Sequence, residues 1–269
     1  MSTINGTFLS LHSCNPNLSR YYNTLKFNRR ICLADCLDGG RPPYSESYKF
    51  LDSDEAVRRI GEVNPLEELF FVESNSAHHI SRYLAIHAYD SFTEENGGKR
   101  PENFLVLNFD QHEDHGTPAG RFYCGSWGGY VAADLSCDYL VIGVSKGMEA
   151  FLYPYDNGKE TYSLKEPEVL EEIYSQYDRI YVTVDMDVLT GGKSKRTNWG
   201  HGYIDQSILN ILLKMIPSEK IISADITGFP PKPIEHAEDV DVEEINSYFQ
   251  DITEIAKTLT GLMGKPLYI

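Results

Sequence analysis

The stretch FLVLNFDQHEDHG, residues Phe104 to Gly116, joins an apolar run to a dense group of ionisable side chains. An apolar run of this kind is typical of a strand buried on both faces, as in a parallel sheet. Five of the six residues from Asp110 to His115 are ionisable. Buried charges are costly without compensation, and a divalent cation neutralises carboxylates while it accepts an imidazole lone pair. The stretch therefore predicts a metal-binding strand end, with a solvated acidic loop as the alternative.

Similar apolar runs recur along the chain and alternate with segments of helical periodicity. Strands are expected at Phe70–Glu73, Phe104–Asp110, Tyr139–Val144, Arg179–Asp185 and Ile221–Thr227. Helices are expected at Ser53–Val63, Ala77–Tyr89, Glu166–Tyr177, Asp205–Ile216 and Asp241–Met263. In the first 50 residues, Thr7–His12 and Arg30–Ala34 are candidate strands, Asn23–Arg29 a turn or short hairpin, and Asp38–Ser47 a loop. The alternation predicts an α/β fold, a three-layer α/β/α single domain over residues 1–269 with a mostly parallel central sheet.

Asp110, His112 and Asp114 recur at every second position, which in an extended backbone points their side chains the same way. A second pair, Asp185 and Asp187, follows another apolar strand. An Asp at a strand end is also a common helix cap or turn former. Because functional groups gather beyond the carboxyl ends of strands in open α/β sheets, we expect the two groups to meet around a cation.

Three further positions carry polar side chains near predicted strand ends. His78 and His79 follow the strand Phe70–Glu73, where a His can reach the same rim or cover a helix start. Asp225 is either a carboxylate that orients metal ligands or a turn former. The stretch NWGHG at residues 198–202 offers Trp199 as a pocket wall and His201 as a proton shuttle, or it is an ordinary surface loop.

The chain is acidic, with 40 Asp and Glu against 24 Lys and Arg and a formal net charge of −16. Such a field repels phosphate backbones and anionic membranes, so nucleic acid and membrane are not expected partners. It attracts metal ions and cationic substrates, although it also serves solubility alone. The five cysteines show no zinc-binding spacing, no run of about 18 apolar residues offers a membrane span, and the start lacks a signal-peptide pattern. These features predict a cytoplasmic protein with reduced thiols.

Four of these pieces, in this order, resemble the ureohydrolase family of arginases, agmatinases and formiminoglutamases. The family's Asp-Ala-His-x-Asp is matched in its ligand positions by Asp110, His112 and Asp114. Its later Asp-x-Asp is matched by Asp185 and Asp187, and its earlier Gly-Gly-Asp-His is similar to the stretch that ends in His78 and His79. The resemblance spans roughly residues 70 to 230 and implies a single arginase-like domain with a central parallel sheet.

The resemblance implies two manganese ions, with other divalent metals as alternatives. Asp110 and Asp185 would bridge the ions, His78 or His79 with Asp114 would complete one site, and His112 with Asp187 the other. The implied reaction is hydrolysis of a guanidino group with release of urea. Asp114 or His201 would pass a proton to the leaving amine. Family members are often oligomers, so a homo-oligomer is an open expectation.

Three departures from the family pattern concern the substrate. The family's guanidinium-binding Glu is Gly228 here, with Glu235 and Glu238 the nearest acids. Thr190-Gly191 replaces an Asp-Pro, and the stretch Cys124–Gly128 replaces a His-Gly turn. The substrate is therefore expected to be a small-molecule or peptide guanidino compound or another amide. Two alternatives are a zinc-dependent amide hydrolase like the deacetylases and a catalytically inactive metal-binding relative.

Overall fold

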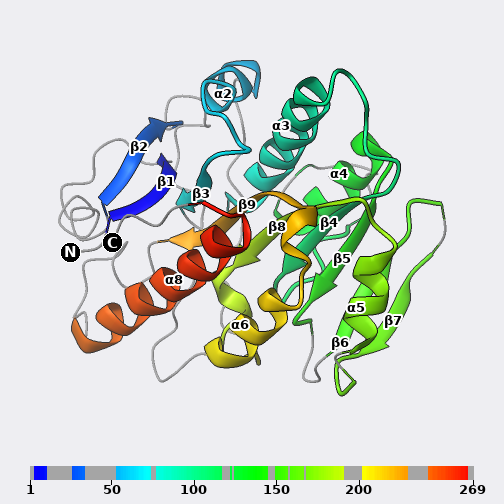
Figure 1. Ribbon diagram of the computed structural model, residues 1–269. Coiled ribbons are helices and arrows are strands. Elements are labelled where there is room, and N and C mark those ends of the chain that lie inside the picture. Colours follow the sequence, from blue (N-terminus) through cyan, green and yellow to red (C-terminus); the bar gives the residue numbers. More distant parts are fainter. Residues whose placement is uncertain are drawn as a thin grey trace.

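A computed structural model describes residues 3–10, 26–33, 53–73, 77–116, 122, 124–144, 149–156, 158–166, 168–190, 202–229 and 242–265. Nine strands form one sheet in the order β2-β1-β3-β9-β8-β4-β5-β6-β7 (Figure 1). The strands are β1 (Thr3–Ser10), β2 (Lys26–Cys32), β3 (Leu69–Glu73), β4 (Phe104–Phe109), β5 (Asp138–Ile142), β6 (Glu149–Tyr153), β7 (Glu160–Ser163), β8 (Arg179–Asp185) and β9 (Ile221–Phe229). Every pairing from β2 across to β5 is parallel, and the two pairings of β6 are antiparallel.

Helices cover both faces of the sheet (Figure 1). One face carries α2 (Ser53–Ile60), α3 (Ile80–Glu95) and α4 (Trp127–Leu135), and the other carries α5 (Glu168–Ser175), α6 (Gln206–Lys214) and α8 (Val242–Leu262). Short 3-10 turns are η3 (Cys124–Ser126), η4 (Met186–Val188) and η5 (Ser218–Lys220). The expected three-layer architecture with a mostly parallel sheet is confirmed.

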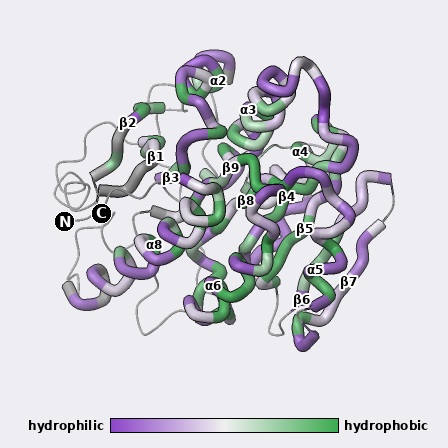
Figure 2. Tube along the Cα trace, in the orientation of Figure 1, coloured by the Kyte–Doolittle hydropathy of each residue, from purple (hydrophilic) through white to green (hydrophobic). Residues whose placement is uncertain are grey.

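Alternation along the strands produces the two cores between these layers. In β4, Leu105 and Leu107 pack into the core under α5, α6 and α8, whereas Phe104 and Val106 pack into the core under α3 and α4. Successive side chains of a strand point to opposite faces, so a strand between two helical layers needs apolar residues on both of its faces. Figure 2 shows this as hydrophobic colour over the central strands.

The five central strands and the five helices expected from periodicity are present, with ends shifted by up to six residues. The expected turn at Asn23–Arg29 is wrong in its described part, because Lys26 begins β2 and this strand pairs with β1 in parallel. The polar residues of this segment suggested a turn. An edge strand tolerates polar residues because one of its sides is exposed to water. The hairpin of β6 and β7 and the helix α4 were not expected. The loop expected at Asp38–Ser47 lies outside the described residues.

The parallel strands β3, β9, β8 and β4 are neighbours, so their carboxyl ends meet at one edge of the sheet. This edge receives the residues that follow Glu73, Phe109 and Asp185. No helix in the described part of the chain is long and apolar enough to span a membrane.

Candidate metal centre

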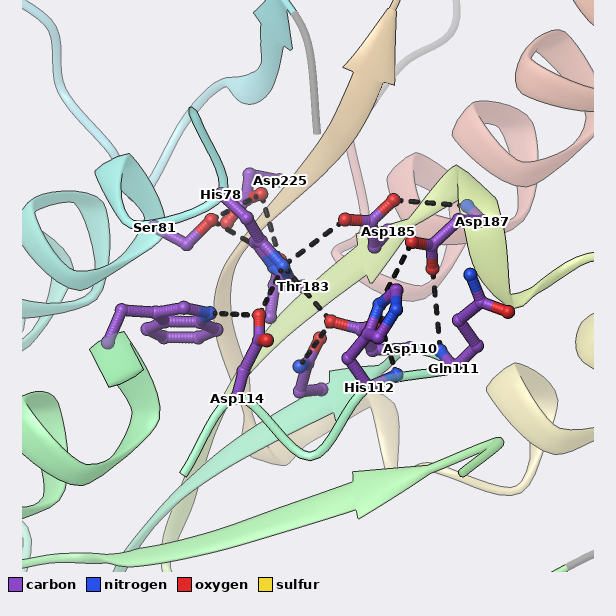
Figure 3. A network of polar contacts seen from close by, with 12 residues as sticks. His78, Ser81, Asp110, Gln111, His112, Asp114, Thr183, Asp185, Asp187 and Asp225 are labelled. Atoms are coloured by element: carbon purple, nitrogen blue, oxygen red, sulfur yellow. Dashed lines mark hydrogen bonds and ion pairs between the residues drawn. The ribbon is translucent and has the colours of Figure 1, made fainter. Parts of the chain in front are cut away.

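Four carboxylates and two histidines converge at this edge from three strand ends (Figure 3). Asp110 directly follows β4, with His112 and Asp114 in the loop beyond it. Asp185 ends β8 and Asp187 lies in η4, while His78 precedes α3. The four carboxylates and His78 are buried, whereas the His112 side chain is 43% exposed.

The first group forms around His78. Its Nδ1 lies 3.1 Å from Asp110 Oδ2, 3.1 Å from Asp114 Oδ2 and 3.3 Å from Asp185 Oδ2. This buried nitrogen forms no hydrogen bond with any described residue, although three carboxylate oxygens surround it. An imidazole nitrogen that faces several carboxylate oxygens is the donor set of a divalent cation site. The ligand atoms of His78, Asp110 and Asp114 lie within 4.8 Å of one another, as a metal ion requires.

The second group forms around His112. Its Nδ1 lies 3.3 Å from Asp110 Oδ1 and 3.1 Å from Asp187 Oδ2. The ligand atoms of Asp110, His112 and Asp187 also lie within 4.8 Å of one another. Asp110 therefore takes part in both groups, with Oδ2 in the first and Oδ1 in the second. A carboxylate shared in this way is the geometry of a bridge between two cations.

The structure corrects how the alternating residues were expected to point. Asp114 lies in the first group and His112 in the second, so the side chains of Asp110, His112 and Asp114 do not share one direction. The reason is that the chain leaves the extended conformation after Phe109, and Asp114 has a positive φ of 49°. For Asp185, Oδ2 belongs to the first group, while Oδ1 accepts a hydrogen bond of 3.0 Å from the Asp187 amide.

His78 and His79, which the sequence leaves as alternatives, lie in different surroundings. The His79 ring packs edge-on against Phe122, with ring centroids 5.4 Å apart. Burial, reinforced by the neighbouring His78, lowers the pKa of His79 to about 3. Of the two, His78 is the one that faces the carboxylates.

The buried carboxylates repel one another, and this repulsion shifts their pKa values. Burial, followed by the charge of Asp110, raises the pKa of Asp114 to about 7 and that of Asp187 to about 6. Burial and then the charge of Asp187 raise the pKa of Asp185 well above its usual range. Burial opposes protonation of His112, yet its contacts with Asp110 and Asp187 raise its pKa to about 11. Without a cation the cluster retains protons, which a dication in the same place would displace.

A buried network behind His78 fixes the orientation of its ring. His78 Nε2 lies 3.1 Å from Thr183 Oγ1, and this hydroxyl donates to Asp225 Oδ1 at 2.9 Å. Asp225 also accepts from Ser81 at 3.0 Å and from Tyr181 at 2.5 Å. Since the Thr183 proton is given to Asp225, the neutral His78 donates its Nε2–H to Thr183 and turns the Nδ1 lone pair toward the carboxylates. Asp225 lies inside β9, so the prediction that it forms a turn is wrong. The hypothesis that it orients a metal ligand agrees with these hydrogen bonds.

We expect Asp225→Asn to weaken metal binding because the amide can no longer accept all three hydroxyl donors and His78 loses its fixed tautomer. Partners of this kind change metal affinity by roughly 10- to 100-fold. Isothermal titration with Mn²⁺ measures the change. Ser223→Ala is the matched control, because Ser223 makes a buried hydrogen bond to Pro65 O from the same strand. An unchanged affinity in Asp225→Asn would contradict the assignment.

Comparisons with known proteins extend these observations. No family model matches the chain. An uncharacterized protein of Thermotoga maritima is 27% identical over 176 residues, which cover 64% of this chain and 68% of that protein. Among solved structures, the arginase of Bacillus caldovelox matches with a TM-score of 0.57 and 13% identity, over 99% of this chain and 100% of that one.

Two further structures agree. The arginase of Bacillus cereus has a TM-score of 0.57 and 15% identity over 98% of this chain and 99% of that one. The proclavaminate amidino hydrolase of Streptomyces clavuligerus has a TM-score of 0.56 and 13% identity over 98% of this chain and 93% of that one. This chain has the ureohydrolase fold.

Gly228, in β9, is the residue expected from the sequence to stand where the ureohydrolase pattern has a guanidinium-binding Glu. Its φ is +95°, a conformation that residues with a side chain rarely adopt. A Cβ at this position would lie 3.1 Å from Met186 Cβ and 3.3 Å from Asp185 Oδ1. Tyr248 holds the backbone in place by donating a hydrogen bond to the Gly228 carbonyl. A Glu at position 228 would therefore need local rearrangement beside Asp185.

Two residues of the site in this ureohydrolase fold were not identified from the sequence, and other residues named there lie outside the described part of the chain. Trp127 and Asn108 contact the carboxylates, Trp127 Nε1 at 2.9 Å from Asp114 Oδ2 and Asn108 Nδ2 at 3.2 Å from Asp110 Oδ2. Asn108 stood next to the metal motif, so its position in the strand was a usable signal. Outside the described residues lie Trp199, His201, Glu235 and Glu238.

Proposed function

We propose that this chain is a binuclear, manganese-dependent hydrolase that cleaves a C–N bond of a guanidino group and releases urea. The observation that carries the proposal is the position of Asp110, whose two carboxylate oxygens face two separate His–carboxylate groups. The ureohydrolase fold adds support, because both groups lie at the carboxyl edge of its parallel strands. The proposal covers residues 1–269 as one domain.

The residues present fit a pair of divalent cations. His78, Asp110, Asp114 and Asp185 would hold one ion, and Asp110, His112 and Asp187 the other, with Asp185 as a second bridge. The buried His78 Nδ1 has no hydrogen bond in the described structure, and the Thr183 network leaves its lone pair free for a metal. Many carboxylate oxygens with two imidazoles suit manganese, although affinity alone favours later metals.

When bound, the two ions would supply a hydroxide nucleophile near neutral pH by lowering the pKa of water. The protein's side chains supply the negative charge that balances the ions and hold the ligand atoms in position. Asp110 and Asp185 keep negative charge between the two groups, and Asp187 is held in η4 by the hydrogen bond that its backbone N–H donates to Asp185 Oδ1. Asp114 is our candidate for passing a proton to the leaving amine, and His201 is the alternative.

The substrate we propose is a cationic small molecule or peptide that carries a guanidino group, in keeping with the net charge of −16. Gly228 implies that the cation is held by a residue other than the one in the family pattern. The same observation favours a second candidate, a relative that binds metal without turnover. Two groups sharing Asp110 disfavour the single-zinc deacetylase arrangement.

Metal content and urea release together test the proposal. Purified protein loaded with Mn²⁺ is analysed for metal per chain and assayed with arginine, agmatine and arginyl peptides. We expect two manganese ions per chain and urea from at least one substrate. Two bound ions with no urea from any of these, or from a wider panel of guanidines and amides, would support the inactive relative. A single zinc per chain would support the deacetylase-like alternative.

A further inference from the structure

The start of α4 contacts Asp114 through a side chain that does not titrate. The indole Nε1–H of Trp127 donates to Asp114 Oδ2 at 2.9 Å, and the same oxygen lies 3.1 Å from His78 Nδ1. A carboxylate oxygen has two lone pairs, so the indole occupies one and leaves the other toward the cluster. Trp127 is completely buried, and its indole N–H can only donate a hydrogen bond.

The backbone around Trp127 holds the same loop. The Gly128 amide donates to the Asp114 carbonyl at 2.9 Å, and the Gly116 amide donates to the Gly125 carbonyl at 3.1 Å. A Cβ on Gly129 would lie 2.8 Å from the Gly116 carbonyl oxygen, so a glycine is required for the two segments to approach. Asp114 has a φ of 49°, in the left-handed region that Asp adopts more readily than most residues with a side chain. The helix start is thus hydrogen-bonded to the loop at the residue where the backbone of the loop turns.

The Trp127 ring also covers His78. Their ring centroids lie 4.9 Å apart, and Tyr139 packs edge-on against the indole at 5.6 Å. All three rings are buried. One side chain therefore sets the rotamer of Asp114 and keeps water from this side of His78.

We propose that Trp127 is a positioning residue for the ion held by His78, Asp110, Asp114 and Asp185, and a built-in optical reporter of that ion. The inference rests on the metal centre of the proposed function and deepens it. Trp127 strengthens the binding of the ion in this buried group. It does not act on the ion of His112 and Asp187, because that group lies beyond its reach. No atom of Trp127 takes part in the reaction. Its replacement should therefore weaken metal binding first, and turnover should fall as a consequence.

The first test is Mn²⁺ titration of Trp127→Phe, which keeps an aromatic ring and removes the N–H donor. We expect one equivalent of metal to bind about 10- to 100-fold more weakly and the other to stay within about three-fold of the parent. The control for lost core packing is Phe104→Leu, a buried residue at the opposite end of β4. It should leave both affinities unchanged. If both equivalents weaken equally in Trp127→Phe, or neither weakens, the positioning role is wrong.

The second test needs no change at Trp127 and so does not depend on the folding of that variant. In Trp199→Phe, Trp127 is the only tryptophan, because the chain has two. Titration with Co²⁺, whose absorption quenches nearby indoles, should lower its emission by at least half, and Asp114→Asn should abolish the decrease at the same Co²⁺ concentration. Unchanged emission with metal bound would overturn the proposal. A parent protein that binds no metal would instead refute the proposed function.

Discussion

Asp110→Asn is expected to lose both metal ions and to lower the rate of urea release by at least about 10³-fold. The substitution keeps the shape of the side chain and replaces a charged oxygen with an amide nitrogen, which cannot bind a cation. Since Asp110 faces both groups, one change removes a ligand from each. A metal pair contributes several kcal/mol of charge stabilisation, and each 1.36 kcal/mol corresponds to a tenfold change in rate. Elemental analysis and a urea assay measure the two effects.

The matched control is Glu113→Gln, in the same loop. Glu113 pairs with Lys159 at 2.8 Å and accepts a hydrogen bond from Tyr153, away from the two groups. This variant removes one negative charge from the loop, as Asp110→Asn does, and should retain two metals and most of the activity. Full activity in Asp110→Asn, or equal losses in both variants, would show that a general loss of charge is responsible and that Asp110 is no bridge.

Metal removal is expected to destabilise the protein, and more so at pH 8 than at pH 5. In the metal-free protein the pKa values of Asp114 and Asp187 are about 7 and 6, above the ordinary 3.8. The folded state therefore binds more protons than the unfolded chain between roughly pH 4 and 7, and stability falls as pH rises. His112 acts in the same direction above its ordinary 6.5, because its pKa is about 11.

Binding of Mn²⁺ reverses this loss. At a concentration 1,000 times the dissociation constant, each ion adds about 4 kcal/mol to the free energy of unfolding. Two ions should raise the melting temperature at pH 8 by on the order of 15 °C, with a smaller rise at pH 5 where protons compete. Thermal unfolding with chelator and with Mn²⁺ at both pH values tests this. Equal melting temperatures in all four conditions would argue against a metal cluster.

The sequence predicts the sheet because its central strands are built mainly from apolar residues, as the run Phe104–Leu107 illustrates. It also predicts which strand ends carry the metal ligands, because a carboxylate such as Asp185 after a buried strand requires compensation. Strand order was not predictable, since pairings such as β3 with β9 join segments about 150 residues apart and depend on packing rather than local pattern.

Finer features of the site depend on backbone geometry that local pattern does not encode. His78 and His79 are adjacent, and only the start of α3 at Ile80 decides which of them turns toward the carboxylates. The division of His112 and Asp114 between two groups follows from the positive φ of Asp114. The sequence marks Trp127 only as part of the stretch Cys124–Gly128 that departs from the family pattern, and nothing in that stretch indicates a contact with Asp114.

The sharing of one carboxylate by two metal ions can be tested in a single measurement, anomalous diffraction at the manganese edge from a crystal grown with Mn²⁺. Two peaks are predicted on either side of Asp110, one bounded by His78, Asp114 and Asp185 and the other by His112 and Asp187. A map with no peak there, or with the side chains turned apart around an empty space, would contradict it.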